Sequence, residues 1–370
     1  MVPSQPGAGT GQAGGVACVP AGESASETDE ASFRLLNEFQ RGFPLASRPF
    51  AVLGEAVGLD EDGVLAHFRR WQADGLVSRI GAVFAPRRVG ASALAALSAP
   101  AGRLDAVAAQ VSAFAEVNHN YEREHDYNLW FVLTAASAAR LDEVVAQIEC
   151  ETGCPVIVLP LEEEFHIDLG FCLAGGGRES PAAPTIPPAM TEAGCALPAI
   201  ERTLMAALQG GIALEARPFH ALGRECGLSE AMVIELIEGW LREGLVKRFG
   251  VVVRHHELGF RANAMCVWNV PDELAHDVGC RLAAQSAVTL CYRRRRVLPG
   301  WPYNLYCMIH GKTREEVLAA RAAIVALLGL DRFAHAVLFS TRRFKQRGAR
   351  YWATASDGQG AESCRTGAAQ

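Results

Sequence analysis

The sequence lacks the features that place a chain in a membrane or outside the cell. No hydrophobic run reaches the roughly 18 residues that a membrane-spanning helix needs, and the N-terminal stretch lacks the positive-then-apolar order of a signal peptide. The 11 cysteines show no CxxC spacing, which argues against a zinc site and a disulfide framework. These absences predict a cytoplasmic protein with reduced thiols.

Signatures of common cofactors and strong charge of one sign are also missing. No GxGxxG, P-loop or lysine Schiff-base signature rises above chance, because the two Gly-rich stretches lie in an expected leader and linker. The net charge of −6 over 370 residues gives no overall attraction to nucleic acid. Half of the residues are hydrophobic, so the chain can bury an ample core, and its length predicts two to four domains.

The strongest pattern present is an internal repeat. Residues 35–90 match residues 204–259 at a constant offset without a gap, so that Arg48, Pro49 and Phe50 correspond to Arg217, Pro218 and Phe219. Further on, YNLWF from Tyr127 recurs as YNLYC from Tyr303. The chain is therefore predicted to consist of two related halves joined by a Gly- and Pro-rich linker.

Each half reads as the same series of elements. Three short helices, the third capped by Asp60 or Ser229, lead into a strand that enters a wing, which predicts a winged helix-turn-helix. The order strand, helix, two strands, helix, strand follows, which is the ferredoxin-like βαββαβ pattern. The predicted fold class is therefore α+β, a tandem repeat of a winged helix-turn-helix and a ferredoxin-like βαββαβ domain. The expected boundaries are a disordered leader at 1–30, winged helices at 31–90 and 198–259, ferredoxin-like domains at 91–172 and 260–350, a linker at 173–197 and a disordered tail at 351–370.

This domain order resembles the Lrp/AsnC transcription regulators, which keeps a DNA-binding regulator, including a haem-responsive one, as an alternative function. The presumptive recognition helix of the second half, SEAMVIELIEGWLREG, carries four glutamates against a single arginine. Acids at that position repel phosphate, so DNA binding is not expected.

Titratable residues concentrate in the stretch VNHNYEREHDYNLWF, residues 117–131. If it is a strand, alternation places His119, Tyr121, Arg123 and His125 on one face. The matching strand of the second half contains four consecutive arginines, Arg293 to Arg296. Such a run is either a solvated charge cluster or a site for a polyanion, and guanidinium groups match carboxylates in bidentate fashion.

These motifs carry a specific resemblance. NHNYEREHDYNLWF, LPLEEEFHIDLGF and CYRRRRVLPGWPYNLYCMIHG resemble the sirohaem decarboxylases, and the resemblance covers roughly residues 33–350 of both halves. It implies loss of carbon dioxide from two acetate side chains of sirohaem, which gives 12,18-didecarboxysirohaem in haem d1 biosynthesis. Related enzymes serve an alternative route to haem b, and the sequence alone separates these two pathways only weakly. The resemblance implies no cofactor beyond the iron tetrapyrrole substrate.

The chemistry that the resemblance implies needs cations for the remaining carboxylates, a poorly solvated pocket and a proton donor. The catalytic candidates are His119, His166, Tyr121 and His125, with histidine favoured because its pKa lies near neutral pH. One of these histidines is alternatively an axial ligand of the sirohaem iron. The substrate-binding candidates are Arg123, Tyr127, Trp130, Tyr292, Arg293, Arg294, Arg296, Trp301, Tyr303 and Lys345, and Phe131 is a further candidate for an apolar wall.

Two expectations concern the halves. His119 corresponds to Leu290 and His166 to Lys345, so we expect the first half to transfer protons and the second to bind substrate. We also expect the two ferredoxin-like domains to pair within one chain, with the acidic run 162–164 and the basic run 342–347 setting the pairing. Homo-oligomers or related decarboxylase subunits are further possible partners.

Overall fold

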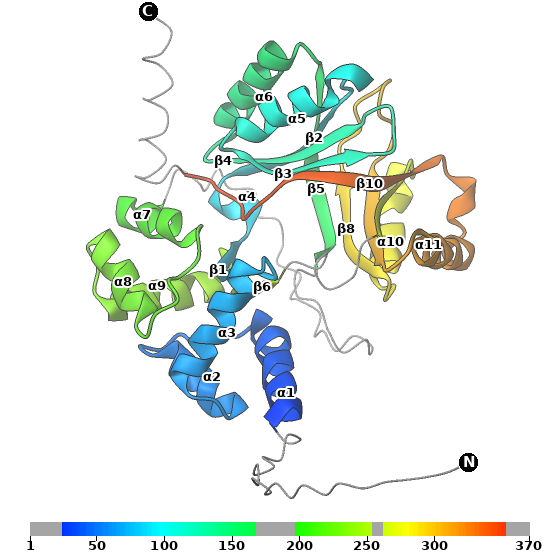
Figure 1. The fold of residues 1–370 in the computed structure, drawn as a ribbon. Helices are drawn as coiled ribbons and strands as arrows, with labels where there is room; N and C mark the ends of the chain where they lie inside the picture. Colours follow the sequence, from blue (N-terminus) through cyan, green and yellow to red (C-terminus); the bar gives the residue numbers. More distant parts are fainter. Residues whose placement is uncertain (1–23, 168–196, 254–261, 353–370) are drawn as a thin grey trace, which may run out of the picture.

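The computed structural model describes residues 24–167, 197–253 and 262–352. Its elements repeat in the two halves (Figure 1). The first half comprises α1 (Ser24–Asn37), η1 (Glu38–Gln40), α2 (Pro49–Val57), α3 (Glu61–Ala73), β1 (Val77–Phe84), α4 (Pro86–Val89), β2 (Ala91–Leu97), η2 (Ala101–Arg103), α5 (Leu104–Ala113), β3 (Val117–Arg123), β4 (Leu129–Ala135), α6 (Ala138–Thr152) and β5 (Val156–Ile167). The second comprises α7 (Ala199–Leu208), α8 (Pro218–Cys226), α9 (Glu230–Glu243), β6 (Val246–Val253), β7 (Ala262–Trp268), α10 (Asp272–Ala283), β8 (Val288–Arg294), β9 (Leu305–Gly311), α11 (Arg314–Leu328), η5 (Leu330–Arg332) and β10 (His335–Gln346).

The helices of the winged units begin and end where the sequence signals lie. The Asp60 carboxylate accepts a hydrogen bond from the Gly63 N–H at 2.7 Å, and the Ser229 hydroxyl caps α9 in the same way. One boundary differs from the expectation, since α1 begins at Ser24, inside the predicted leader. The rest of that leader, most of the linker and most of the tail lie outside the described residues.

The two strands predicted to enter wings are each other's partners. The strands β1 and β6 form, but they pair with each other, antiparallel and across the two halves, in a two-stranded sheet. Gly81 lies opposite Gly250 in this sheet, and a Cβ at Gly250 would lie 2.4 Å from the Gln40 carbonyl oxygen. The close approach that glycine permits, and one hydrophobic core shared by both units, join the winged helices into a single layer.

The eight remaining strands close into one barrel in the order β10-β3-β4-β2-β5-β8-β9-β7. Each half supplies a sheet, and its long last strand crosses to the other half. The beginning of β5 pairs with β2, whereas Leu161 to Ile167 pair with β8. Likewise the beginning of β10 pairs with β7, whereas Ser340 to Gln346 pair with β3. The two ferredoxin-like domains therefore pair within one chain through exchanged strands.

Two hydrophobic cores lie between the barrel and the helices that cover it, and a third fills the barrel interior. Helices α5 and α6 cover the sheet of the first half, and α10 and α11 cover that of the second (Figure 1). The barrel interior is filled by large side chains from both halves, among them Trp130, Trp301 and Tyr306. Phe131, expected as a wall of the site, instead faces α5 and α6 in the outer core, because it alternates with Trp130 along β4.

Within the described ranges, no helix is both long and apolar enough to cross a lipid bilayer.

Candidate active site at the winged-helix end of the barrel

The face predicted for the titratable strand exists in β3, but it ends at Arg123. Tyr121 lies opposite Trp130 in the register of β3 and β4, which directs it into the barrel. The rings of His119 and Tyr121 are 6.1 Å apart between centroids, and the Arg123 guanidinium carbon lies 5.8 Å from the Tyr121 ring centroid. These three residues therefore share one face, which continues towards the winged-helix layer at His119.

His125 is not part of this cluster. The chain turns after Arg123, and the His125 ring packs at 5.2 Å against Trp301, while its Nδ1 accepts the Tyr127 N–H at 3.0 Å. Four residues of extended chain, from His119 to Arg123, span about 13 Å, so the turn that carries His125 lies at the end of β3 opposite to His119. The alternation argument was wrong for His125, because it assumed that the strand continues.

His119 is a neutral imidazole at ordinary pH. Burial, together with the positive charge of Arg79, lowers the pKa of His119 to about 4, and a hydrogen bond to the Arg347 backbone acts in the opposite direction. The expectation of a histidine with a pKa near neutrality therefore does not apply to the ligand-free site. The pKa of the neighbouring Tyr121 is raised by burial, against the opposing charges of Arg123 and Arg343, so its phenol keeps its proton.

His166 lies at the opposite corner of the barrel. It sits on the crossing part of β5, opposite Cys291 of β8, whereas His119 lies opposite Gln346 of β10. Strands β4 and β2 separate β3 from β5. Both histidines lie on seams between the halves, so the surroundings of each include a strand of the second half.

Two arginines face the barrel interior and pair with no carboxylate of the described residues. Arg123 donates to the Leu338 carbonyl at 3.0 Å, and Arg294 donates to the Leu159 carbonyl at 2.7 Å. Each thus binds the crossing strand of the other half. The Arg294 guanidinium carbon also lies 4.6 Å from the ring centroid of Tyr292, which stacks on Tyr306 inside the barrel. The Nε of each arginine is enclosed without a hydrogen-bond partner, so both have donors left for an anion.

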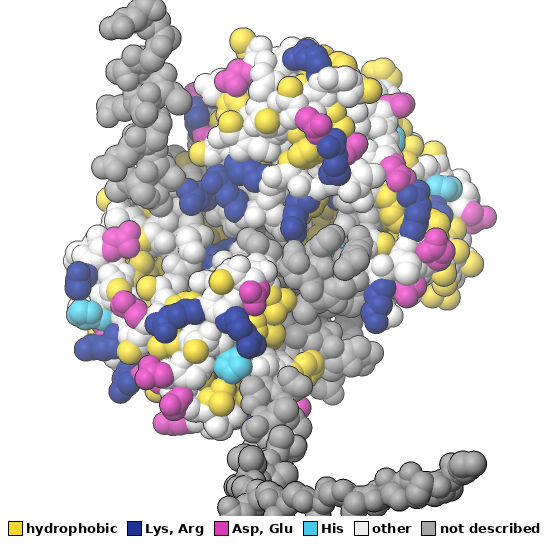
Figure 2. Space-filling view, in the orientation of Figure 1, with side chains coloured by type: hydrophobic (Ala, Val, Ile, Leu, Met, Phe, Trp, Pro, Cys, Tyr) yellow, Lys and Arg dark blue, Asp and Glu magenta, His cyan; other side chains and the backbone are white. Residues whose placement is uncertain are grey.

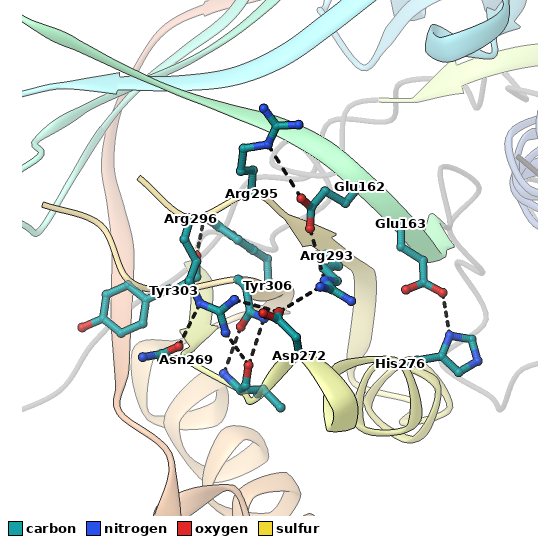
Figure 3. A network of polar contacts seen from close by, with 12 residues as sticks. Glu162, Glu163, Asn269, Asp272, His276, Arg293, Arg295, Arg296, Tyr303 and Tyr306 are labelled. Carbon is teal, nitrogen blue, oxygen red and sulfur yellow. Dashed lines mark hydrogen bonds and ion pairs between the residues drawn. The ribbon is translucent and has the colours of Figure 1, made fainter. Parts of the chain in front are cut away.

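The other arginines of the run are neutralised by the protein (Figure 3). Arg293 forms ion pairs with Glu162 and Asp272, and Arg295 forms one with Glu162. Arg296 binds Asp272 at 2.7 Å and the carbonyls of Val270 and Pro302. The assignment of Arg293 and Arg296 to substrate is therefore corrected, because the run pairs with acids that are distant in the sequence.

Lys345 is also placed away from the site. Its Nζ donates to the carbonyls of Ser112 and Phe114 at 2.6 and 2.8 Å, which satisfies the C-terminal end of α5. Burial, reinforced by Arg347 and Arg350, lowers the pKa of Lys345 to about 8. The amine is therefore a helix cap rather than a substrate ligand.

The aromatic candidates form one cluster between the halves. Trp301 is its centre: its ring lies 4.9 Å from Trp130, 4.9 Å from Tyr303 and 5.9 Å from Tyr127. Its Nε1 donates to the Tyr306 hydroxyl at 2.6 Å. The cluster fills the barrel towards the end where β3 finishes. Trp130 joins it to the wall beneath Tyr121, whereas Tyr127, Trp301 and Tyr303 contact one another rather than His119.

The expected charge complementarity occurs, with different partners. Glu164 binds Lys247 and Glu163 lies 2.6 Å from His276, all across the seam between β5 and the second half. In the basic run, Arg342 binds Glu122 and Asp105 of the first half. The acidic and basic runs therefore each pair with the opposite half and not with each other.

One site residue was missed from the sequence, Arg79 of β1. Its charge acts on His119, and a Cβ added at Gly348 would lie 2.5 Å from its Nη1. In Figure 2, Lys and Arg side chains gather along the border between the barrel and the winged-helix layer. In the described part of the chain, no group of three or more His, Cys, Asp or Glu side chains is arranged to hold a metal ion.

The fold and this site define an AsnC-like scaffold adapted to a carboxylate-rich ligand. A family model described as an AsnC-like ligand binding domain matches residues 88–166 and 257–345, and one described as a siroheme decarboxylase NirDL-like HTH domain matches residues 33–77 and 201–246. The "siroheme decarboxylase NirDL subunit" of Paracoccus denitrificans (strain Pd 1222) is 45% identical over 87% of this chain and 97% of its own length. The chain therefore belongs to the NirDL siroheme decarboxylase family.

A shorter relative and two solved structures agree with this assignment. The "siroheme decarboxylase NirD subunit" of Pseudomonas aeruginosa is 50% identical over 39% of this chain and 97% of its own length. The crystal structure of the siroheme decarboxylase NirDL covers 92% of this chain and 99% of that chain at 28% identity, with a TM-score of 0.65. The same enzyme in co-complex with an iron-uroporphyrin III analogue gives a TM-score of 0.64 at the same identity and coverage.

Proposed function

We propose that this chain is a sirohaem decarboxylase, which converts sirohaem to 12,18-didecarboxysirohaem by removing two acetate carboxyl groups in haem d1 biosynthesis. The observation that carries this function is the 45% identity to a siroheme decarboxylase NirDL subunit over 97% of that protein's length. Arg123 and Arg294, which pair with no described carboxylate, and the buried aromatic rings of the barrel support it, because they suit a flat macrocycle with carboxylate arms.

Each decarboxylation breaks the bond between the acetate methylene and its carboxylate. The bonding electron pair stays on the methylene and delocalises into the macrocycle, carbon dioxide leaves, and one proton then converts the carbanion to a methyl group. The protein must therefore supply one proton per carbon dioxide and must keep water from stabilising the departing carboxylate.

Arg123 and Arg294 are the proposed anchors for carboxylates that remain. Each already uses one N–H on a backbone carbonyl of the crossing strand, which fixes the guanidinium plane before substrate arrives. Preorganised donors of this kind lose little freedom on binding. Because the two arginines come from opposite halves, they hold the macrocycle from two sides of the barrel.

Tyr121 and His119 are the proposed proton-transfer residues on β3, and His166 is the one proposed for the opposite seam, beside β8. The Tyr121 phenol is protonated in the free protein, because burial raises its pKa. His119 is neutral until anionic carboxylates bind beside it, and these raise its pKa and let it take up the proton it delivers. A neutral imidazole is also the form that ligates iron, so axial ligation of the substrate's iron by a histidine is the alternative role.

We further propose that the reaction needs no nicotinamide, flavin, pyridoxal phosphate, nucleotide or added metal. The test is anaerobic incubation of gel-filtered protein with sirohaem in buffer that contains a chelator, followed by mass analysis of the tetrapyrrole. We expect a product lighter by two molecules of carbon dioxide. An unchanged mass under all conditions would contradict the function, and strict dependence on an added cofactor would contradict only the second proposal.

Assembly beyond the single chain is a separate proposal. We infer that both halves of one chain complete the site, and that any homo-oligomer or complex with related decarboxylase subunits adds to this unit without rebuilding it. Light scattering of the purified chain, combined with activity measured across protein concentrations, tests the inference. Activity that vanished on dilution to a monomer would contradict it.

A further inference from the structure

The winged-helix layer extends one cation towards the catalytic end of the barrel. Arg79 lies on β1, the strand that would be a DNA-contacting wing in a regulator, and it acts electrostatically on His119 of β3. The wings pair with each other through β1 and β6. Arg79 therefore faces the barrel rather than a DNA groove.

Among the described residues, no carboxylate pairs with the Arg79 guanidinium. Its Nη2 donates to the Ala82 carbonyl at 3.1 Å, and its Nε is buried with no hydrogen-bond partner. No ion pair joins Arg79 to a described residue. Burial lowers the pKa of Arg79 to about 10. An isolated folded chain therefore holds this charge at a cost in stability.

The backbone around Arg79 leaves it room. A Cβ at Gly211 would lie 2.9 Å from the Arg79 Cβ, and one at Gly348 would lie 2.5 Å from Nη1. Glycine at both positions therefore lets the side chain lie between the winged-helix layer and the end of β10. The described backbone leaves space for this arginine, although no carboxylate in the described ranges neutralises it.

The equivalent arginine of the second half has a different environment. Arg248 occupies the matching position on β6, and its Nη1 donates to the backbone carbonyls of Gln40 and Val251. It thereby joins the end of η1 to the two-stranded sheet. Arg248 of the second half therefore holds parts of the winged-helix layer together, whereas Arg79 of the first half lies beside His119.

We propose that Arg79 is a substrate-positioning residue of the winged-helix layer, which binds a carboxylate arm of the tetrapyrrole next to His119. This inference rests on the proposed function, since sirohaem brings the carboxylates. The bound carboxylate offsets the charge of Arg79 and removes the repulsion that disfavours a protonated His119. The winged helix thus serves as a wall of the active site.

The experiment compares Arg79→Met and Arg248→Met with wild type in the full chain. The dissociation constant of iron-uroporphyrin III is measured from the Soret absorbance, and thermal unfolding is measured without ligand. For Arg79→Met we expect binding about 10- to 100-fold weaker, as for loss of one charge-assisted contact, with an unfolding temperature equal to or above that of wild type. For Arg248→Met we expect the reverse, with binding within about twofold and a lower unfolding temperature.

A lower unfolding temperature of Arg79→Met with unchanged affinity would overturn the proposal, because it would make Arg79 a structural residue. Arg79→Lys adds a second criterion: it keeps the charge but not the planar fork, and we expect it to recover part of the lost affinity. Equal affinity of wild type and both Arg79 variants would also overturn it. If wild type itself failed to bind iron-uroporphyrin III, the proposed function would fail together with this inference.

Discussion

Replacing His119 by leucine, the residue at the equivalent position 290, tests whether the imidazole is neutral in the free site. The folded-state pKa of His119 is about 4, below the roughly 6.5 of an unfolded histidine. The unfolded chain therefore binds the proton first, and stability is lost as the pH falls from about 6.5 towards 4. Linkage with these two values gives about 2 kcal/mol of lost stability at pH 5 and almost none at pH 7.5.

The assay is denaturant unfolding of wild type and His119→Leu at pH 7.5 and pH 5.0. The quantity of interest is the change in free energy of unfolding between the two pH values, because the other titrating groups are common to both proteins. We expect wild type to lose about 2 kcal/mol more than the variant. His335→Gln, at an exposed position, serves as the matched control and should behave as wild type. Equal losses in wild type and His119→Leu would refute the neutral imidazole and the order of proton uptake derived from it.

Three further outcomes follow from the contacts described. Tyr121→Phe should lower the rate of carbon dioxide release at least about tenfold in single-turnover assays, because the proton donor is removed. The affinity for iron-uroporphyrin III should change less than about threefold. An unchanged rate would exclude the phenol as the acid. Arg294→Met should weaken the affinity for iron-uroporphyrin III roughly 10- to 100-fold, whereas Arg296→Met should leave this affinity unchanged and lower the unfolding temperature. Similar affinities of the two variants would contradict the assignment of Arg294 to substrate and Arg296 to the fold. Trp301→Ala should reduce the free energy of unfolding by roughly 3 to 5 kcal/mol, measured with denaturant at pH 7.5, and a loss below about 1 kcal/mol would show that the aromatic cluster does not join the halves.

Local signals in the sequence were sufficient for the elements and insufficient for their partners. The caps at Asp60 and Ser229 and the short apolar runs of β2 and β4 are set by neighbours within a few residues, so helices and strands could be predicted. The pairing of β1 with β6 and the exchange of β5 and β10 depend on contacts between segments more than a hundred residues apart. No periodicity within one strand encodes which edge it meets.

The same distinction separates the candidate residues that the structure brings together from those that it places elsewhere. His119, Tyr121 and Arg123 follow from alternation along one strand, whereas Arg293 is removed from the site by Glu162 and Asp272, which only the fold brings near. Lys345 shares its position in the repeat with His166, yet it caps α5. No feature of GLVSRIG marks Arg79 as a site residue. Gly211 and Gly348 lie against Arg79 only in the folded chain, so their role could not be predicted from the sequence.

Because the last strands are exchanged, the covalent connection between the halves determines whether their association depends on protein concentration. Each half completes its partner's sheet, so neither β3 nor β8 has a protected edge when the other half is absent. A cut between the halves would remove no contact of the barrel and would convert an intramolecular association into one governed by concentration. The shorter NirD relative, which matches 39% of this chain, shows that half-length chains occur in the family. Association of two separate halves would depend on their concentrations, whereas in this chain the effective concentration of each half is fixed at all dilutions.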